Sequence, residues 1–202
     1  MIENKQQAAI DSYFDTVQAS LFPVSLQYKM IHVHIPKTAG TALRRALFDS
    51  EVVRHVRASE IPLALWEAFP SITIVRHPIE RLLSSYKYHV MSGYSGVLLK
   101  RHPDLKSLSL EAYVDRFVGK SDLLGMQKSY ISRDDSTKPI VDHVIRFEHI
   151  NEELPKILEG LGVDVKINVV KQSPKNKVIA TKAVLKQIKA HYKEDYETFG
   201  YS

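Results

Sequence analysis

The feature that most constrains this chain is a strand pattern that leads through a short turn directly into a helix-forming stretch. Residues 29–35 alternate and are rich in apolar and β-branched side chains, which predicts a β-strand. The turn that follows contains proline, lysine, two threonines and a glycine, and residues 42–49 favour a helix. A strand, a tight turn and a helix in this order are typical of α/β proteins.

The same alternation recurs along the chain. It predicts further strands at 51–56, 71–76 and 142–147, and helices at 59–69, 151–162 and 181–196. A long helical middle is predicted at 79–132, with interruptions near residues 93–96 and at Pro103, and residues 1–28 predict a mostly helical lead-in. Pro78, Gly162 and Thr181 suit a first helical residue, a helix end and an N-cap. We therefore expect an α/β fold, a three-layer parallel sheet flanked by helices, as a single domain over residues 1–202.

Composition limits the classes of protein to consider. The 202 residues include no cysteine, which excludes disulfides and thiolate metal sites. The sequence shows no signal-peptide pattern and no apolar run of 18 residues, so we expect a cytoplasmic protein without a membrane span.

Positive charge is concentrated near the C-terminus. The net charge is +5, and residues 165–193 contain eight lysines and no acidic residue. This favours an anionic partner, although a solvated helix face is the alternative interpretation. In the last predicted helix the apolar side chains share one face, and the opposite face carries Lys182, Lys186, Lys189 and Lys193.

The turn His34-Ile35-Pro36-Lys37-Thr38-Ala39-Gly40-Thr41 has the chemistry of an anion site. Backbone N–H groups at a helix N-terminus are unpaired and attract phosphate or sulfate. Lys37 adds an ammonium group, and Thr38 and Thr41 add hydroxyl donors. The turn is not a Walker A loop, because its lysine precedes its only glycine. A merely tight turn is the alternative, but it has no need of the lysine and both threonines.

A second anion motif begins where the strand at 71–76 ends. It reads Arg76-His77-Pro78-Ile79-Glu80-Arg81-Leu82-Leu83-Ser84-Ser85-Tyr86. Arg76 provides a fork of donors suited to phosphate, and Ser84 provides a hydroxyl on the following helix. The carboxyl ends of parallel strands are where α/β sheets bind ligands, so both motifs are predicted at the binding edge.

Together the two motifs resemble those of the PAPS-dependent sulfotransferases, in particular the carbohydrate type of the sulfotransferase family 2 group. The first resembles the 5′-phosphosulfate loop, and the second matches the 3′-phosphate signature R-x-P-x-x-R-x-x-S-x-Y at every fixed position. The resemblance spans residues 29–201 and implies a P-loop NTPase-like sulfotransferase architecture.

The resemblance also implies roles for individual residues. It assigns the 5′-phosphate of the donor to five residues of the loop: Lys37, Thr38, Ala39, Gly40 and Thr41. Lys37 would also contact the bridging oxygen of the leaving group. Arg76 and Ser84 would hold the 3′-phosphate. Arg81 is either a further ligand or part of a structural ion pair, and Tyr86 is expected in the core.

Weaker similarities extend toward the C-terminus. Gln127 is retained in a segment where relatives have N-x-x-x-Q-T, Phe147-Glu148 ends a late strand, and residues 171–173 replace an Asn-x-Ser contact. The ending at 195–201 matches a terminal D-x-x-x-F-G-Y pattern.

Sulfuryl transfer to a hydroxyl needs a base with a pKa near neutral, which points to histidine. We predict His55, because the segment from His55 to Glu60 and Ile61 resembles the H-x-x-x-x-E/D-[ILF] stretch of several carbohydrate sulfotransferases. His34 is the second candidate. His32 is expected to be buried and hydrogen-bonded, and His89 could line the cleft.

PAPS is therefore the expected donor, PAP the product and a hydroxyl of a carbohydrate the expected acceptor, and the lysine-rich segment favours an acidic carbohydrate. No metal and no nucleic acid is expected. Two alternatives stay open. One is a small-molecule kinase with a P-loop-like cradle, for which neither a Walker A lysine nor an acidic Mg²⁺ ligand is evident. The other is a non-catalytic PAP- or anion-binding module.

Overall fold

The computed structural model describes residues 8, 11–12, 23–25, 27–48, 55–92, 96–120, 124–133, 138–165, 167 and 178–202. These residues form two compact units, which are described separately. The first unit comprises residues 1–75 and 127–169, and the second comprises residues 76–126 and 170–202. The expectation of a single domain over residues 1–202 stays a prediction.

The first unit is built on a four-stranded sheet in the order β1-β2-β3-β4. The strands are β1 (Val24–Ser25), β2 (Met30–Val33), β3 (Ser71–Val75) and β4 (His143–Arg146). The last three run parallel, as predicted, but β1 is antiparallel to β2, so the sheet is mixed. A short turn ending at Lys29 (φ 47°) returns the chain against β1, and such short connections join only antiparallel strands. The expectation of a fully parallel sheet is corrected at this edge.

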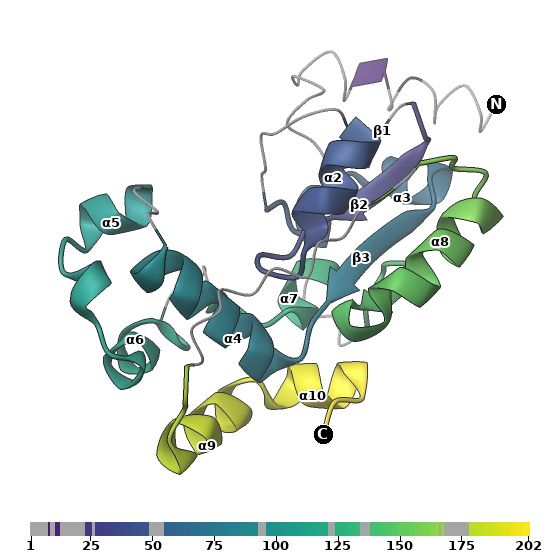
Figure 1. Cartoon of the computed structure of the whole chain (residues 1–202). Helices are drawn as coiled ribbons and strands as arrows, with labels where there is room; N and C mark the ends of the chain where they lie inside the picture. Colours follow the sequence, from purple (N-terminus) through teal and green to yellow (C-terminus); the bar gives the residue numbers. More distant parts are fainter. Residues whose placement is uncertain are drawn as a thin grey trace. The chain divides into compact units, whose positions relative to one another are not determined.

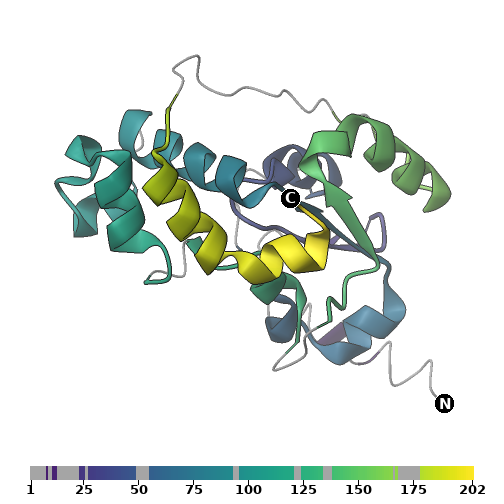
Figure 2. The same ribbon diagram turned by 90° about the horizontal axis from the view of Figure 1, so that it is seen from below.

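Strands β2 and β3 are buried along their whole length, which is typical of parallel strands covered on both faces. Helices α2 (Gly40–Phe48) and α8 (Ile150–Gly160) cover one face, where their leucines pack against isoleucines of β3 and β4. Figures 1 and 2 show α3 (Leu63–Ala68) on the opposite face. The register of β3 against β4 is fixed by Asp142, whose carboxylate accepts bonds of 2.8 and 2.6 Å from the N–H and hydroxyl of Ser71.

Several predicted elements differ in detail. Helix α8 ends as predicted near Gly162, whose φ of 68° is left-handed and whose N–H donates to Glu159. The predicted strand at 51–56 is wrong at residues 55 and 56, which lie outside any strand, and residues 51–54 lie outside the described part. In the lead-in, residues 8 and 11–12 are helical but residues 24–25 form β1.

The second unit is helical. Its helices are α4 (Pro78–Tyr86), α5 (Val97–Arg101), α6 (Leu110–Phe117), α9 (Lys182–His191) and α10 (Lys193–Phe199), and a π-helical turn (Lys87–Met91) continues α4. Pro78 begins α4 and the Thr181 hydroxyl accepts from the N–H of Val184, so both predicted helix starts are confirmed. The long helical middle is instead several short helices. The last of them, α7 (Lys128–Ile131), belongs to the first unit.

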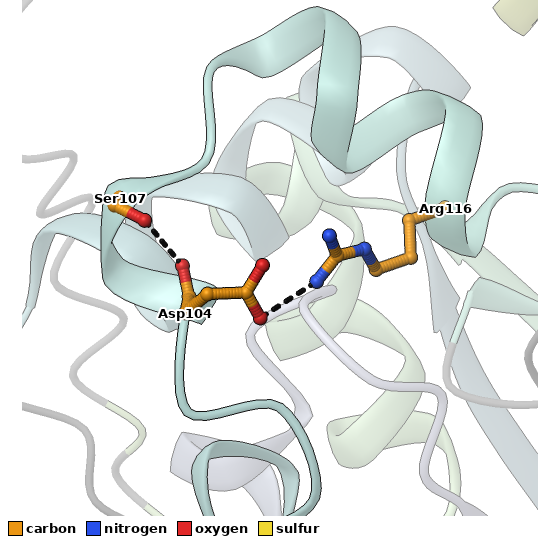
Figure 3. Close-up of polar contacts among 3 residues, drawn as sticks. All are labelled: Asp104, Ser107 and Arg116. Atoms are coloured by element: carbon orange, nitrogen blue, oxygen red, sulfur yellow. Dashed lines mark hydrogen bonds and ion pairs between the residues drawn. The ribbon is translucent and has the colours of Figure 1, made fainter.

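One apolar core joins α4, α6 and α9 through buried leucines, valines and aromatic rings, and Figure 2 shows α9 running beside α4. A surface contact fixes the loop before α6 (Figure 3). Arg116 donates to Asp104 at 2.8 Å and the hydroxyl of Ser107 donates to the Asp104 carbonyl at 2.8 Å. This bond to Arg116 lowers the pKa of Asp104. Among the described helices, none combines the length and apolar character needed to cross a membrane.

Candidate active site

The loop between β2 and α2 has an unusual backbone. Lys37 and Ala39 have φ angles of 66° and 69°, in the left-handed region that non-glycine residues rarely adopt. Each such residue costs about 1–2 kcal/mol, and strain of this kind concentrates at binding and catalytic sites. Alternation of left- and right-handed residues turns successive N–H groups toward one point, which makes a concavity for an anion. The N-terminus of α2 adds its dipole at Gly40.

Thr38 holds this loop from within. Its side chain is fully buried, and its hydroxyl donates to the carbonyl of Ile35 at 2.9 Å. In this structure the hydroxyl proton is thus donated within the loop, and the expected contact of Thr38 with the phosphate stays a prediction. Thr41, in contrast, is exposed on the first turn of α2.

Gly40 is required by its neighbour His34. A Cβ atom at position 40 would lie 2.8 Å from Nε2 of His34 and still closer to the ring carbon Cδ2. The His34 ring therefore packs directly against the backbone that begins α2. A larger residue at position 40 would force the ring or the loop to move.

His55, the predicted base, is hydrogen-bonded to the end of β2. Its Nδ1 lies 3.0 Å from the carbonyl oxygen of His34. Because a carbonyl only accepts, Nδ1 carries the hydrogen and Nε2 keeps the lone pair of a base. His55 is exposed overall, yet the protein atoms around its ring partly desolvate it and lower its pKa; the bond to the His34 carbonyl opposes this, and the charges of Arg44 and Lys37 lower the pKa further. The ring is therefore neutral near pH 7, as a general base must be.

Two buried imidazoles lie behind His55. The ring of His34 is 4.8 Å from that of His55 and 5.5 Å from that of His32, centroid to centroid. Burial, with the charge of Arg44, lowers the pKa of His32 to about 3. His32 is buried as expected, but neither of its ring nitrogens has a hydrogen-bond partner in the described part of the chain. Arg44, which sequence reasoning missed, is itself buried on α2.

The segment after His55 is anchored by Glu60, which belongs to the predicted motif, and by Arg57, whose role sequence reasoning missed. The carboxylate of Glu60 accepts from the N–H of Arg57 at 3.1 Å, which closes a turn over residues 58–60. The guanidinium of Arg57 donates to the hydroxyl of Ser129 at 3.2 Å and lies over the ring of Tyr130. Glu60 was therefore a signal in the sequence for a capped turn after His55, through its bond to the N–H of Arg57.

The second motif lies in the second unit. Arg76 directly follows β3, its side chain is 11 % exposed, and its guanidinium lies 3.9 Å from the carboxylate of Glu80. Ser84 is half-buried on α4. Arg81 is buried, donates to the carbonyl of Gly125 at 2.6 Å and lies 5.6 Å from the ring of Tyr192. These contacts support a structural role for Arg81, through a carbonyl and a ring instead of the expected ion pair.

The C-terminal residues pack beside this motif. The ring of His77 contacts Tyr196 and Tyr201 edge-on, with centroids 5.4 and 5.3 Å apart. The terminal pattern at 195–201 therefore buttresses the residue next to Arg76. His89, expected as a possible cleft residue, is buried, with its Nδ1 2.7 Å from the hydroxyl of Tyr113.

The structure also places two further residues of the sulfotransferase-like motifs, Tyr86 and Gln127. The Tyr86 hydroxyl donates to the carbonyl of Leu108 at 3.0 Å within the apolar core, as expected for a core residue. Gln127 is fully buried at the start of α7. The predicted contact at residues 171–173 lies outside the described residues.

Comparison with known proteins gives one family. Residues 20–112 match the model of the sulfotransferase family. No curated protein matches the chain significantly. The matched segment contains the loop after β2, His55 and the motif that begins at Arg76. The resemblance to sulfotransferases seen in the two motifs is thereby confirmed over residues 20–112, the part of the chain that contains both motifs.

Proposed function

We propose that this protein transfers a sulfuryl group from PAPS to a hydroxyl of a carbohydrate acceptor. The observation that carries the proposal lies within the first unit. A loop with two left-handed residues gathers backbone N–H groups at the start of α2, and a neutral histidine is hydrogen-bonded to the residue that opens the same loop. Group transfer to a hydroxyl requires a site that stabilises the charge of the leaving anion and a base that accepts the hydroxyl proton.

On the donor side, the backbone of residues 37–41 binds the 5′-phosphosulfate. Lys37 acts as the electrostatic catalyst. Its ammonium is near enough to His34 and His55 to lower the pKa of both. As the bond from sulfur to the bridging oxygen breaks, negative charge grows on the leaving phosphate, and Lys37 stabilises it.

The transfer step needs one proton acceptor. The acceptor's hydroxyl oxygen attacks sulfur in line with the leaving phosphate, and its proton passes to Nε2 of His55. The bond from sulfur to the bridging oxygen breaks, and its electron pair leaves with PAP. The products are the sulfate ester, PAP and a protonated His55, which then releases its proton to water.

Arg76 and Ser84 would distinguish PAPS from nucleotides that lack a 3′-phosphate. This assignment is supported by the signature they share with the family and by the chemistry of a guanidinium beside a hydroxyl. Both side chains retain partial solvent access on their own unit.

An acidic carbohydrate is the acceptor that the surface charge favours. Lys182, Lys186, Lys189 and Lys193 are all exposed on α9 and at the start of α10. Neutralising all four should weaken binding of an acidic acceptor more than binding of a neutral one. Equal losses for both acceptors would argue against an acidic substrate.

A thermal-shift comparison tests the proposed function. PAP, ATP and duplex DNA are added in parallel to the full chain. A ligand present at 100 times its Kd stabilises the folded state by about 2.7 kcal/mol. We expect a clear shift with PAP and little with ATP or DNA, because PAP carries both phosphates. No shift with PAP would refute the proposal, and a larger shift with ATP would favour the kinase alternative.

A further inference from the structure

We propose that His34 is a positioning residue that couples the donor loop to the base, through its ring at Gly40 and its backbone carbonyl at His55. The inference rests on the proposed function, because it concerns the same site. It assigns a task to a side chain that neither binds the donor nor takes the proton.

The first contact is between the His34 ring and the loop. The ring occupies the space that a side chain at position 40 would need, at 2.8 Å from Nε2 to the Cβ position. Gly40 is not among the described glycines with a positive φ, so its backbone alone does not require glycine. The ring therefore decides how the chain enters α2, and with it the direction of the first N–H groups of the helix.

The second contact is between His34 and the base. The carbonyl of His34 accepts from Nδ1 of His55 at 3.0 Å, which fixes the tautomer with its lone pair on Nε2. The His34 ring also lies against the His55 ring at 4.8 Å, with the planes inclined by 59°. One residue thus sets both the protonated nitrogen and the orientation of the catalytic ring.

The third observation concerns charge. His34 is 5 % exposed and is faced by His32 on β2, His55, Arg44 on α2 and Lys37 in the loop. Burial, followed by these neighbours, holds the pKa of His34 well below its usual value. The ring stays neutral throughout the physiological range, so it acts by its shape and position. It therefore suits the role of a support better than that of the alternative base.

A double substitution tests the contact with the loop. Gly40→Ala should lower PAP affinity about tenfold, as expected for overpacking against a buried ring. Adding His34→Ala should restore most of the loss, because it removes the ring that the new methyl group meets. The matched control Gly40→Ala with His34→Phe keeps a ring there and should show no rescue. A double variant with His34→Ala that binds PAP no better than Gly40→Ala alone would overturn the proposal.

A pH profile tests the contact with the base. His34→Ala exposes more of His55, so the pKa of His55 should rise and the acidic limb of kcat/KM should move to higher pH. His34→Phe should leave the limb in place, and so should His143→Ala, a control on β4. A role in stability alone would not move this limb, so an unchanged limb in His34→Ala would contradict the proposal.

Two measurements keep the inference separate from the proposed function. Nitrogen NMR of the wild-type protein should show His55 with hydrogen on Nδ1, and hydrogen on Nε2 instead would overturn the proposal. The thermal midpoints of Gly40→Ala and its double variant need no donor. If the wild type binds no PAP, the proposed function fails, while the midpoints and the tautomer still decide whether His34 holds the loop and His55.

Discussion

The two phosphate motifs use different parts of the polypeptide. In the loop after β2, the groups proposed to bind the anion are backbone N–H groups, and the chain there adopts left-handed conformations at Lys37 and Ala39. After β3, the groups proposed to bind the second phosphate are the side chains of Arg76 and Ser84, and α4 begins regularly with Pro78 at its first position. A backbone site depends on local conformation, so packing neighbours such as His34 and Thr38 become part of it. In a site made of side chains on a regular helix, each ligand can be substituted by itself without changing the backbone conformation.

Removing the proposed base, His55, which lies beside the loop after β2, sharpens this comparison most. His55→Ala should lower kcat by about 10²–10⁴-fold, the usual contribution of a general base, while PAP affinity stays unchanged. Initial rates and calorimetric titration with PAP measure the two quantities, and His149→Ala, at an exposed position, serves as the control. Full activity in His55→Ala would place the base elsewhere.

The wild-type rate should also depend on pH in a defined direction. A base works only when it is unprotonated, so kcat/KM should fall as pH drops through the pKa of His55. Partial desolvation lowers that pKa from the ordinary histidine value of 6.5, so the midpoint should lie below pH 6.5. A midpoint above pH 6.5 would contradict the environment described for His55.

Charge and conformation can be separated at Lys37. Lys37→Ala and Lys37→Gly should both lower kcat by about 10²–10³-fold, since both remove the charge that stabilises the leaving phosphate. Glycine adopts a φ of 66° without the strain that alanine suffers there. The free energy of unfolding, measured with denaturant, should therefore be about 1 kcal/mol higher for the Gly variant than for the Ala variant. Equal stabilities would mean that the loop is not strained.

The side-chain motif should show smaller, graded losses. Arg76→Ala should lower PAP affinity by about 10–100-fold, as expected for a hydrogen bond to a charged group. Affinity for adenosine 5′-phosphosulfate, which lacks the 3′-phosphate, should not change. Ser84→Ala should cost about tenfold or less, and Glu80→Gln, which removes the ion pair at 3.9 Å, should not weaken binding. If Arg76→Ala lowers the affinity for both nucleotides equally, Arg76 does not bind the 3′-phosphate.

The last prediction concerns stability at acidic pH and not activity. The unfolded chain protonates His32 near pH 6.5, whereas the folded state resists protonation until about pH 3. The contribution of neutral His32 to the free energy of unfolding is therefore complete above pH 6.5. It is lost as pH falls from 6.5 toward 3, by at most about 1.4 kcal/mol per pH unit. His32→Leu should reduce this slope in urea unfolding measured between pH 4.5 and 7. An identical slope in the variant would show that His32 is hydrated or bonded in the folded state.

Much of the framework was predictable from local sequence. Strands β2, β3 and β4 and helices α2 and α8 lie within a few residues of their predicted bounds, because alternating and periodic apolar residues indicate which side of an element is buried. The helix predicted at 181–196 begins as expected but is divided at Tyr192 into α9 and α10. The antiparallel β1 was missed, since a strand of two residues is too short to leave a pattern. The helical middle was predicted as too continuous, because apolar periodicity survives across the turns that separate α4, α5 and α6.

For the candidate site, the sequence by itself determined the residue types and their order: a lysine and a glycine after one strand, an arginine after the next, and a histidine between them. These follow from local rules of turns, helix ends and donor chemistry. Only the tertiary structure shows that the Thr38 hydroxyl donates to a carbonyl within the loop and that the His34 ring leaves no room for a side chain at Gly40. It alone also shows that the His34 carbonyl selects the tautomer of His55. The physical reason is that burial, hydrogen bonding and pKa depend on neighbours brought together by folding, and the link between His34 and His55 spans 21 positions of chain.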